Sequence, residues 1–338
     1  MSRAGGAMAA RRRQPLRTLA GLVAAAGMAF AAVAQAPPAP PAPAPRAAQR
    51  LLLGIAAAGD RLVSVGARGA ILVSSDAQAW QEVDVPLRSD LTAVSFADAG
   101  AGWAVGHDAA ILRTTDGGRS WTVQRYRPEA GQPLLDVLAL DRDRAYAVGA
   151  HGLFLQTQDG GAHWAEVQAP VVREAELNLY GIRRLGKGAL LVFGEQGRLA
   201  WSVDDGRSWR ALKSPTASTI FGAAALADGG LLLCGAHGNA FIGTDPRRGA
   251  WRKLDTGGVQ ALFACGPAGA GRLVLLGAGN AALLLEPGAG TASRIGDAEA
   301  AAAGLDAPTY SGFAPWRGEL VTVGSRGVRR MPLPAPTP

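Results

Sequence analysis

Apolar residues occur along most of the chain in short runs that turn-forming residues separate. From residue 49 onward, glycine, aspartate or proline interrupts these runs roughly every eight to twelve residues. No stretch keeps apolar residues at the three- and four-residue spacing of a helix over several turns. The pattern therefore predicts an all-β chain built from many short strands.

A unit of about 43 residues repeats seven times through this region. Each unit contains an apolar run that ends on a glycine and continues into a short polar turn, as in WAVGHDA (103–109). The anchor glycines are Gly66, Gly106, Gly149, Gly194, Gly235, Gly277 and Gly324. Their successive spacings are 40, 43, 45, 41, 42 and 47 residues. A period of this length, with room for four strands in each unit, predicts a seven-bladed β-propeller.

The second unit shows how the four strands of a blade, A to D, divide. Strand A is predicted at residues 91–98, strand B at 102–106, strand C at 110–115 and strand D at 121–126. Turn residues lie between each pair of strands. The unit is therefore typical of one propeller blade.

The seventh unit supplies only three such segments, at 310–318, 319–325 and 328–333, before the chain runs into PAPTP. A strand at the outer edge of a sheet needs protection from pairing with other chains, and proline provides it. We therefore expect either that residues just before Leu51 add to this blade or that it stays three-stranded.

A tryptophan follows five of the seven anchors by 14 to 16 residues, and an aspartate precedes each tryptophan. The pairs are Asp76 and Trp80, Asp116 and Trp121, Asp159 and Trp164, Asp204 and Trp209, and Asp245 and Trp251. We predict a C-to-D turn in which the carboxylate accepts backbone N–H bonds, glycine supplies positive φ, and the indole fills the space beside the turn. The units of Gly277 and Gly324 lack the tryptophan, so we expect blades six and seven to be degenerate.

The N-terminal residues have a different composition. Residues 1–34 carry five arginines and no acid, followed by an apolar run of 17 residues that ends in Ala-Val-Ala, which is typical of a secretory signal peptide. We expect cleavage after the small-residue end of this run, at Ala34. The run is shorter than the roughly 20 residues of a spanning helix, so we expect no transmembrane segment in the mature chain. Whether export is general or twin-arginine stays open. We expect a periplasmic protein.

The remaining boundaries follow from composition and charge. Residues 35–48 are rich in alanine and proline and are expected to form a linker, 49–332 the propeller, and 333–338 a proline-rich tail. Removal of the five signal-peptide arginines leaves 29 basic against 27 acidic side chains, a net charge of +2. This small charge argues against a nucleic-acid partner.

The repeated motif carries a resemblance to known proteins. TTDGGRSW, TQDGGAHW and SVDDGRSW resemble the Asp-box, or bacterial neuraminidase repeat, and SSDAQAW and GTDPRRGAW are looser copies. The fuller segment 102–121 resembles the photosystem II stability/assembly factor-like family of seven-bladed propellers, and the resemblance covers roughly residues 49–332. It implies a protein-binding accessory or assembly factor for a membrane complex. In bacteria without photosystems, the resemblance implies that this membrane complex is an RND-type exporter.

One feature departs from this family. Its members often carry an arginine three residues before the Asp-box aspartate, and here only Arg113 matches. The equivalent residues are Val73, Gln156, Trp201, Ile242 and Leu284. The departure weakens the expectation that this chain docks on photosystem subunits.

A carbohydrate-binding or sialidase-like glycosidase propeller is the alternative. Such a site needs three arginines, a tyrosine nucleophile paired with glutamate, and an acidic aspartate. Tyr180 and Tyr310 fall on predicted A strands, and Glu174 and Glu176 lie near the first. The N-terminal blade reads LLLGIAAAG and lacks the Phe/Tyr-Arg-Ile-Pro segment of sialidases. We therefore assign no catalytic residue and expect no enzymatic activity.

Metal and thiol chemistry have weak signals. His151 and His237 occupy the same phase of units three and five, which are not neighbours, so we expect turn residues and neither metal nor cofactor. Cys234 and Cys265 lie inside apolar runs and are expected to be buried. Whether they pair in an oxidising compartment stays open.

The second residue after each anchor lies at the B-to-C turn, and these turns surround the channel mouth of a propeller. We call this set the turn ring: Arg68, Asp108, His151, Gln196, His237, Gly279 and Arg326. The alternative is that hairpin turns are polar for local reasons. We predict that the side chains of this ring bind a protein partner, and that the chain itself is a monomer.

Overall fold

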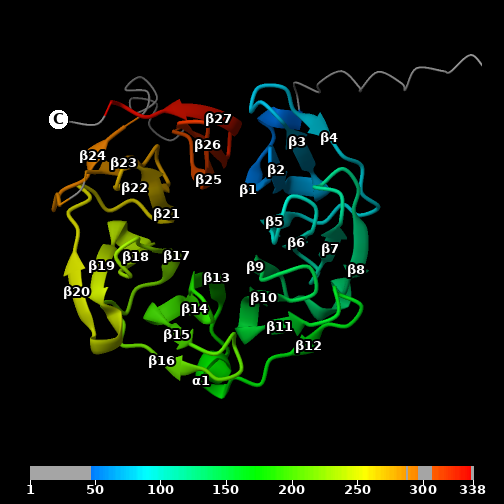
Figure 1. Cartoon of the computed structure of the whole chain (residues 1–338), viewed down its shortest axis with the longest axis horizontal. Coiled ribbons are helices and arrows are strands. Elements are labelled where there is room, and N and C mark those ends of the chain that lie inside the picture. Colours follow the sequence, from blue (N-terminus) through cyan, green and yellow to red (C-terminus); the bar gives the residue numbers. More distant parts are fainter. Residues whose placement is uncertain (1–46, 287, 296–306, 336–338) are drawn as a thin grey trace, which may run out of the picture. The chain divides into compact units, whose positions relative to one another are not determined.

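The computed structural model describes residues 47–286, 288–295 and 307–335. Within these residues, seven antiparallel sheets are arranged around a central channel (Figure 1). The predicted all-β, seven-bladed propeller is confirmed. The predicted signal peptide at 1–34 lies outside the described residues, as do most of the linker and residues 336–338.

Strands follow one another in each sheet from the channel outward. Blades one to three contain β1 (Leu52–Ala58), β2 (Arg61–Gly66), β3 (Ile71–Ser74), β4 (Gln81–Glu82), β5 (Leu91–Phe96), β6 (Gly102–Gly106), β7 (Ile111–Thr114), β8 (Thr122–Arg125), β9 (Leu134–Ala139), β10 (Ala145–Gly149), β11 (Phe154–Thr157) and β12 (Ala165–Glu166). Blades four and five contain β13 (Leu179–Gly186), β14 (Ala189–Gly194), β15 (Leu199–Ser202), β16 (Arg210–Ala211), β17 (Ile220–Ala225), β18 (Leu231–Gly235), β19 (Ala240–Asp245) and β20 (Ala250–Lys253). Blades six and seven contain β21 (Leu262–Gly269), β22 (Arg272–Gly277), β23 (Ala282–Leu285), β24 (Ser293–Arg294), β25 (Tyr310–Trp316), β26 (Glu319–Gly324) and β27 (Gly327–Pro332).

Helix is confined to short pieces of the described chain. The α-helix α1 spans Pro170–Arg173, and the 3₁₀ turns are η1 (Ala47–Gln49), η2 (Ala67–Gly69), η3 (Pro128–Ala130), η4 (Ala150–Gly152), η5 (Glu174–Glu176), η6 (Glu195–Gly197), η7 (Ala236–Gly238) and η8 (Pro246–Arg248). None of the helices in the described part is long and apolar enough to cross a membrane.

The core lies between neighbouring blades. Every residue of β6, from Gly102 to Gly106, is buried, and β10 and β18 are buried in the same way. Strands covered on both faces read as continuous apolar runs, which explains the sequence pattern of strand B. Val63 of blade one, for example, packs in one cluster with Leu91 and Ala104 of blade two. Each blade therefore completes its core with the next one.

Blade seven has three strands, β25 to β27, so the three-stranded alternative holds. The segment just before Leu51 does not add a strand; it forms η1, which packs against β27. The backbone approach is so close that a Cβ on Gly327 would lie 1.8 Å from the carbonyl oxygen of Ala48. The inner strand β1 packs against β25 as well as β5, which closes the ring (Figure 1).

Every inner strand contains an irregularity at the same place. The A–B pairing skips the residue after the first paired one, as between Leu52 and Gly54 or between Leu179 and Gly181. A β-bulge of this kind leaves one residue unpaired and re-aims its side chain. We call the seven skipped residues the bulge ring: Leu53, Thr92, Leu135, Tyr180, Phe221, Phe263 and Ser311.

Candidate functional site

The Asp-box aspartates lie at C-to-D turns, where they organise the backbone. Asp116 Oδ1 accepts bonds from the backbone N–H groups of Arg119 and Ser120, both at 3.0 Å, and from Thr114 Oγ1 at 2.8 Å. Gly117 and Gly118 have φ of 75° and 86°, which glycine adopts at little cost. The Trp121 indole is 8% exposed and donates to the Gly118 carbonyl at 3.0 Å.

The carboxylate is stabilised as an anion in these turns. Burial raises the pKa of Asp116, but hydrogen bonds from Ser120, Thr114 and Arg119 outweigh it, so the pKa is lowered. Hydrogen bonds from the backbone and side chain of His163 lower the pKa of Asp159 to about 2. Those from the side chain and backbone of Ser208 lower the pKa of Asp204 to about 2.

The two looser copies differ from each other. Asp76 accepts N–H bonds from Gln78 and Ala79, both at 2.8 Å, so it repeats the turn without glycine. Asp245 precedes η8 and accepts one longer bond, 3.3 Å from the N–H of Arg248. The motif at Asp245 is therefore a helical turn rather than an Asp-box.

Asp-box turns also join neighbouring blades. Tyr146 Oη of blade three donates to the Asp205 carbonyl of blade four at 2.8 Å, and Gln124 Nε2 of blade two donates to the Gly160 carbonyl at 2.8 Å. Arg113, the one residue that matches the arginine of the family, stacks 4.4 Å over the ring of Trp103. It donates to the Arg142 carbonyl of blade three at 2.7 Å. Arg113 thus packs between two blades.

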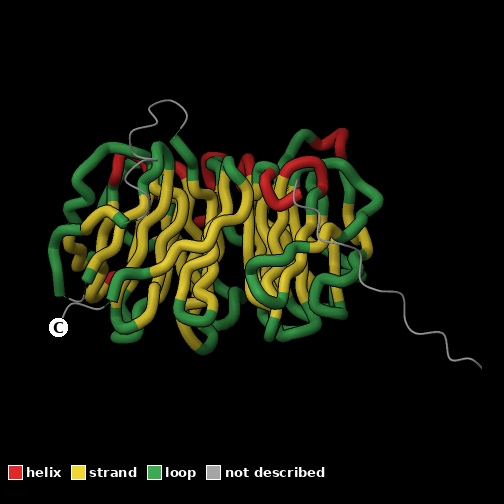
Figure 2. The backbone as a smooth tube through the Cα atoms, turned by 90° about the horizontal axis from the view of Figure 1, so that it is seen from above, coloured by secondary structure: helices red, strands yellow, loops and turns green. Residues whose placement is uncertain are grey.

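The turn ring lies on the face opposite the Asp-boxes. The B-to-C turns of this face include η2, η4, η6 and η7, and Figure 2 shows short helical turns along the upper side of the molecule. Four members of the ring combine an exposed side chain with left-handed backbone: Arg68, His151, Gln196 and His237. Their φ values are 57°, 53°, 52° and 59°, in the left-handed region. The backbone N–H groups of Arg68 and His151 donate to Asp90 Oδ1 and Asn178 Oδ1 of the next blade at 2.8 and 3.0 Å.

Two members of the ring differ from the others. Asp108 is only partly exposed, and its carboxylate accepts a short hydrogen bond from Ser89 Oγ. Arg326 is exposed, but it lies in a two-residue turn between the paired Gly324 and Gly327 and lacks a positive φ. The turns of Arg68 and Arg326 are therefore not equivalent, because blade seven has a shorter hairpin.

The channel is lined by inner strands and not by the turn ring. Its cavity volume is about 1070 Å³, and none of the turn-ring residues is among its described lining residues. All seven members of the bulge ring line it. From the sequence, the residues of the bulge ring were predicted only as parts of the A strands. One signal was available, since Tyr180, Phe221 and Phe263 each lie 14 residues before an anchor glycine.

Aromatic residues occupy one arc of this bulge ring. Tyr180 and Phe221 meet edge to face with ring centroids 4.8 Å apart, and Phe221 and Phe263 are 5.2 Å apart. We call these three residues the aromatic arc. Burial, followed by the Glu195 charge, raises the pKa of Tyr180, so its phenol stays neutral. The arc offers apolar ring surface to the channel.

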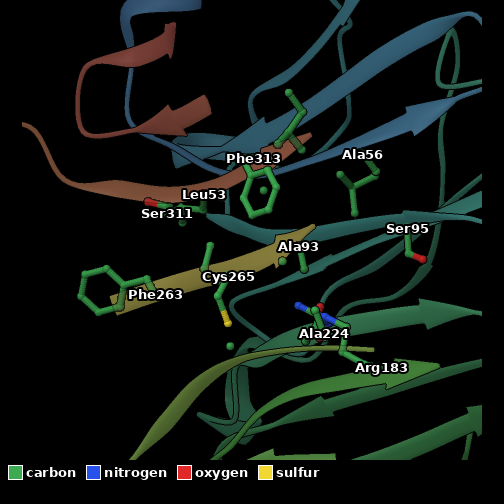
Figure 3. Close-up of a pocket in the computed structure, with 18 of the residues that line it drawn as sticks. Leu53, Ala56, Ala93, Ser95, Arg183, Ala224, Phe263, Cys265, Ser311 and Phe313 are labelled. Carbon is green, nitrogen blue, oxygen red and sulfur yellow. The ribbon is translucent and has the colours of Figure 1, made fainter. Parts of the chain in front are cut away.

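The charged residues among the described lining residues of the channel belong to blades three and four. Asp136 is 7% exposed, and its Oδ2 accepts from the Ile182 N–H at 2.9 Å and from Arg183 Nη1. Arg183 Nη1 also donates to the Ile182 carbonyl at 2.8 Å. Figure 3 shows Arg183 among the residues around the cavity. Arg184, the third charged lining residue, donates to the Leu140 carbonyl at 2.9 Å.

The groups considered for glycosidase chemistry are dispersed. Tyr310 is 6% exposed and donates to Asn280 Oδ1 at 2.9 Å, away from the channel. Glu174 and Glu176 lie in exposed η5, and neither lines the cavity. Among the described lining residues, Asp136 is the one carboxylate. Glycosidases use two, so the described lining residues do not supply a pair of carboxylates.

Among the residues that the structure describes, no group of three or more His, Cys, Asp or Glu side chains is placed so that it could hold a metal ion. Cys234 and Cys265 are buried thiols of blades five and six. Both sulfurs lie close to Gly222, because a Cβ built there would be 2.7 Å from Cys234 Sγ and 3.3 Å from Cys265 Sγ. Burial, then the neighbouring Cys265, raises the pKa of Cys234.

Fold and turns define the class of protein, a seven-bladed Asp-box propeller. Residues 72–299 match the sequence profile of the photosynthesis system II assembly factor YCF48, and the chain belongs to this family. No curated protein sequence matches the chain.

Solved structures agree on the fold. YCF48 bound to D1 peptide superposes with a TM-score of 0.68 at 18% identity, covering 85% of this chain and 94% of that one. Virginiamycin B lyase from Staphylococcus aureus gives 0.69 at 13% identity, covering 85% and 96%. The GH74 xyloglucanase from Xanthomonas campestris gives 0.65 at 17% identity, covering 83% and 52%. Binding proteins and enzymes thus share this fold, and identities this low show the fold alone.

Proposed function

We propose that the chain is a non-enzymatic accessory propeller and that a protein partner docks on the face of the turn ring. One observation carries the proposal. Arg68, His151, Gln196 and His237 present exposed side chains from left-handed backbone at equivalent turns of four blades. Such turns hold charge and hydrogen-bonding groups in fixed relative positions, which a docking surface requires.

The backbone conformation strengthens this interpretation. A left-handed residue other than glycine costs roughly 1 kcal/mol or more. Gly279 occupies the same position in blade six with φ of 59° and without that cost. Glycine would therefore serve the turn at least as well, so the side chains of Arg68, His151 and His237 are not explained by local folding.

Membership of the YCF48 family supports a protein as the ligand, because a solved relative is described as bound to a D1 peptide. The channel wall supports the absence of hydrolysis, because its described residues include a single carboxylate and Arg183 neutralises it. These observations favour the binding role over the glycosidase alternative.

The cellular compartment of the protein and its partner is inferred from the sequence. The signal-peptide pattern of residues 1–34 supports export, so we propose a periplasmic monomer that binds a membrane complex of the envelope. An RND-type exporter is the specific candidate that the resemblance suggests. Identification of the recovered membrane protein tests that candidate separately from the docking face.

The test replaces turn-ring residues with glycine, which adopts left-handed backbone at little cost. The triple variant Arg68→Gly, His151→Gly, His237→Gly should fold as stably as wild type but recover less partner from solubilised membranes. The deficit should be largest at low salt and shrink as salt is raised, because salt screens the contacts that wild type makes and the variant lacks. The matched control is Arg119→Ala, Lys187→Ala, Arg207→Ala, which removes exposed cations from turns on the opposite face. Equal recovery by wild type and the turn-ring variant at every salt concentration would exclude this face.

A further inference from the structure

The bulge ring is chemically asymmetric around the channel. Its aromatic members belong to the consecutive blades four, five and six, whereas the other four blades supply Leu53, Thr92, Leu135 and Ser311. Neither Tyr180, Phe221 nor Phe263 is fully buried, so each leaves ring surface at the channel. Thr92 adds no free donor, because its hydroxyl bonds to the Leu134 carbonyl at 2.8 Å. One side of this level is therefore an apolar aromatic wall.

A cation lies deeper along the same wall. Arg183 follows Tyr180 by three residues on β13, which places their backbones roughly 10 Å apart along the strand. The equivalent lining residues of blades one, two and five are Ala56, Ser95 and Ala224, which are small. The guanidinium carbon of Arg183 lies 5.6 Å from the ring centroid of Phe193. Figure 3 shows Arg183, Ala224 and Ser95 around this part of the cavity.

Asp136 fixes the position of this guanidinium by accepting a hydrogen bond from one of its nitrogens, Nη1. Nη1 is engaged by Asp136 and by the Ile182 carbonyl, whereas Nε and Nη2 have no hydrogen-bond partner among the described residues. The side chain of Arg183 is 41% exposed, so these donors can reach a ligand. A planar guanidinium with free N–H groups is suited to a carboxylate.

We propose that the channel binds a small organic carboxylate with a flat apolar body about the size of naphthalene. The carboxylate accepts hydrogen bonds from Arg183, and the rings pack on the aromatic arc. The cavity of about 1070 Å³ is large enough for such a molecule. One carboxylate and two guanidinium groups among the lining residues give the wall a charge of +1, which favours an anion. The site is separate from the turn ring and does not depend on the docking proposal.

Calorimetric titration of the purified chain with 2-naphthylacetate tests the site. We expect one molecule to bind, and we expect 2-naphthylacetamide, which has the same rings without the charge, to bind at least about tenfold more weakly. A peptide ending in phenylalanine, such as acetyl-Gly-Gly-Phe, offers a carboxylate from a protein terminus and should bind more weakly than the small acid. Equal affinity for acid and amide, tighter binding of the peptide, or no binding at millimolar acid would each overturn the proposal.

Variants locate the ligand within the channel. Asp136→Ala, Arg183→Leu removes both charges together, which avoids leaving Asp136 buried and unpaired, and should lower affinity at least about tenfold. Phe263→Leu keeps the arginine and should weaken binding by about two- to tenfold. If the double variant does not fold, the single variant Arg183→Lys tests the guanidinium in its place, and the single variant Phe263→Leu still tests the aromatic arc. Arg184→Gln should change affinity less than about twofold, and a larger loss there than at Arg183 would contradict the assignment.

Discussion

Tyr146 Oη donates a hydrogen bond of 2.8 Å to the carbonyl oxygen of Asp205 and thereby ties blade three to the Asp-box turn of blade four. The approach is close, since a Cβ on Gly206 would lie 2.3 Å from the same hydroxyl oxygen. Burial, with a further contribution from Asp205, raises the pKa of Tyr146, so the hydroxyl remains a donor at neutral pH. The Asp-box therefore organises its own turn and also offers a docking point to the preceding blade.

Replacement of Tyr146 by phenylalanine tests this contact between blades. The variant loses one hydrogen bond and leaves the Asp205 carbonyl without that donor, so we expect a loss of about 1 kcal/mol in the free energy of unfolding. Thermal or denaturant unfolding measures it. Tyr126→Phe is the matched control, because Tyr126 is 46% exposed. Equal stability of Tyr146→Phe and wild type would show that the contact contributes nothing.

Asp116→Ala should destabilise the fold by about 1–3 kcal/mol, because several donors of the turn lose their acceptor. Partner binding should decline only in step with folding. Asp84→Ala, at an exposed position, should melt like wild type. A variant of Asp116 that melts like wild type yet loses a specific binding activity would show that the Asp-box is a binding site and not a structural turn.

Acid should weaken the fold through Asp159 and Asp204. Their pKa values are lowered from 3.8 to about 2 in the folded chain, so the unfolded state binds more protons between these pH values. The stability that both carboxylates contribute is present above pH 4 and is lost as pH falls toward 2. Denaturant unfolding at several pH values measures the slope. The double variant Asp159→Asn, Asp204→Asn should have a shallower slope, and an unchanged slope would contradict the assignment.

Gly222→Ala should destabilise the contact between blades five and six by about 1–3 kcal/mol, because the added methyl would meet both cysteine sulfurs. Cys234→Ala in the same chain should recover part of that loss by removing the nearer sulfur, which lies 2.7 Å from the added Cβ. Gly186→Ala is the control, since no atom lies within 4 Å of its Cβ position. If Cys234→Ala gives no recovery, the sulfur is not the obstacle.

Sequence periodicity predicted the parts of the fold that repeat. Strand B and its anchor glycine recur because each blade buries that strand on both faces, and the Asp-box recurs because its turn needs the same donors and acceptors each time. A three-stranded seventh blade was one of the two alternatives that the sequence left, because the chain runs into proline after residue 332.

The channel was harder to predict, because it is built from residues that do not repeat. A bulge shifts the alternation of the inner strand, so the direction of Phe221 cannot be read from a period of two. The contact between Asp136 and Arg183 joins neighbouring blades through two charged residues, whereas the equivalents of Arg183 in other blades, such as Ser95 and Ala224, are uncharged. Such contacts are set by the closure of the ring and leave no repeating signal in one sequence.

The docking face can be tested directly by photocrosslinking from inside the native envelope. A photoreactive phenylalanine analogue in place of His237 should crosslink to a membrane protein, whereas the same analogue in place of Arg119, on the opposite face, should not. Both positions are exposed turns, so the comparison isolates the face and not the accessibility of the residue. We expect a specific crosslinked product from position 237 that mass spectrometry identifies as a component of an envelope complex. The same product from position 119 and none from position 237 would contradict the proposal that the turn ring binds the partner.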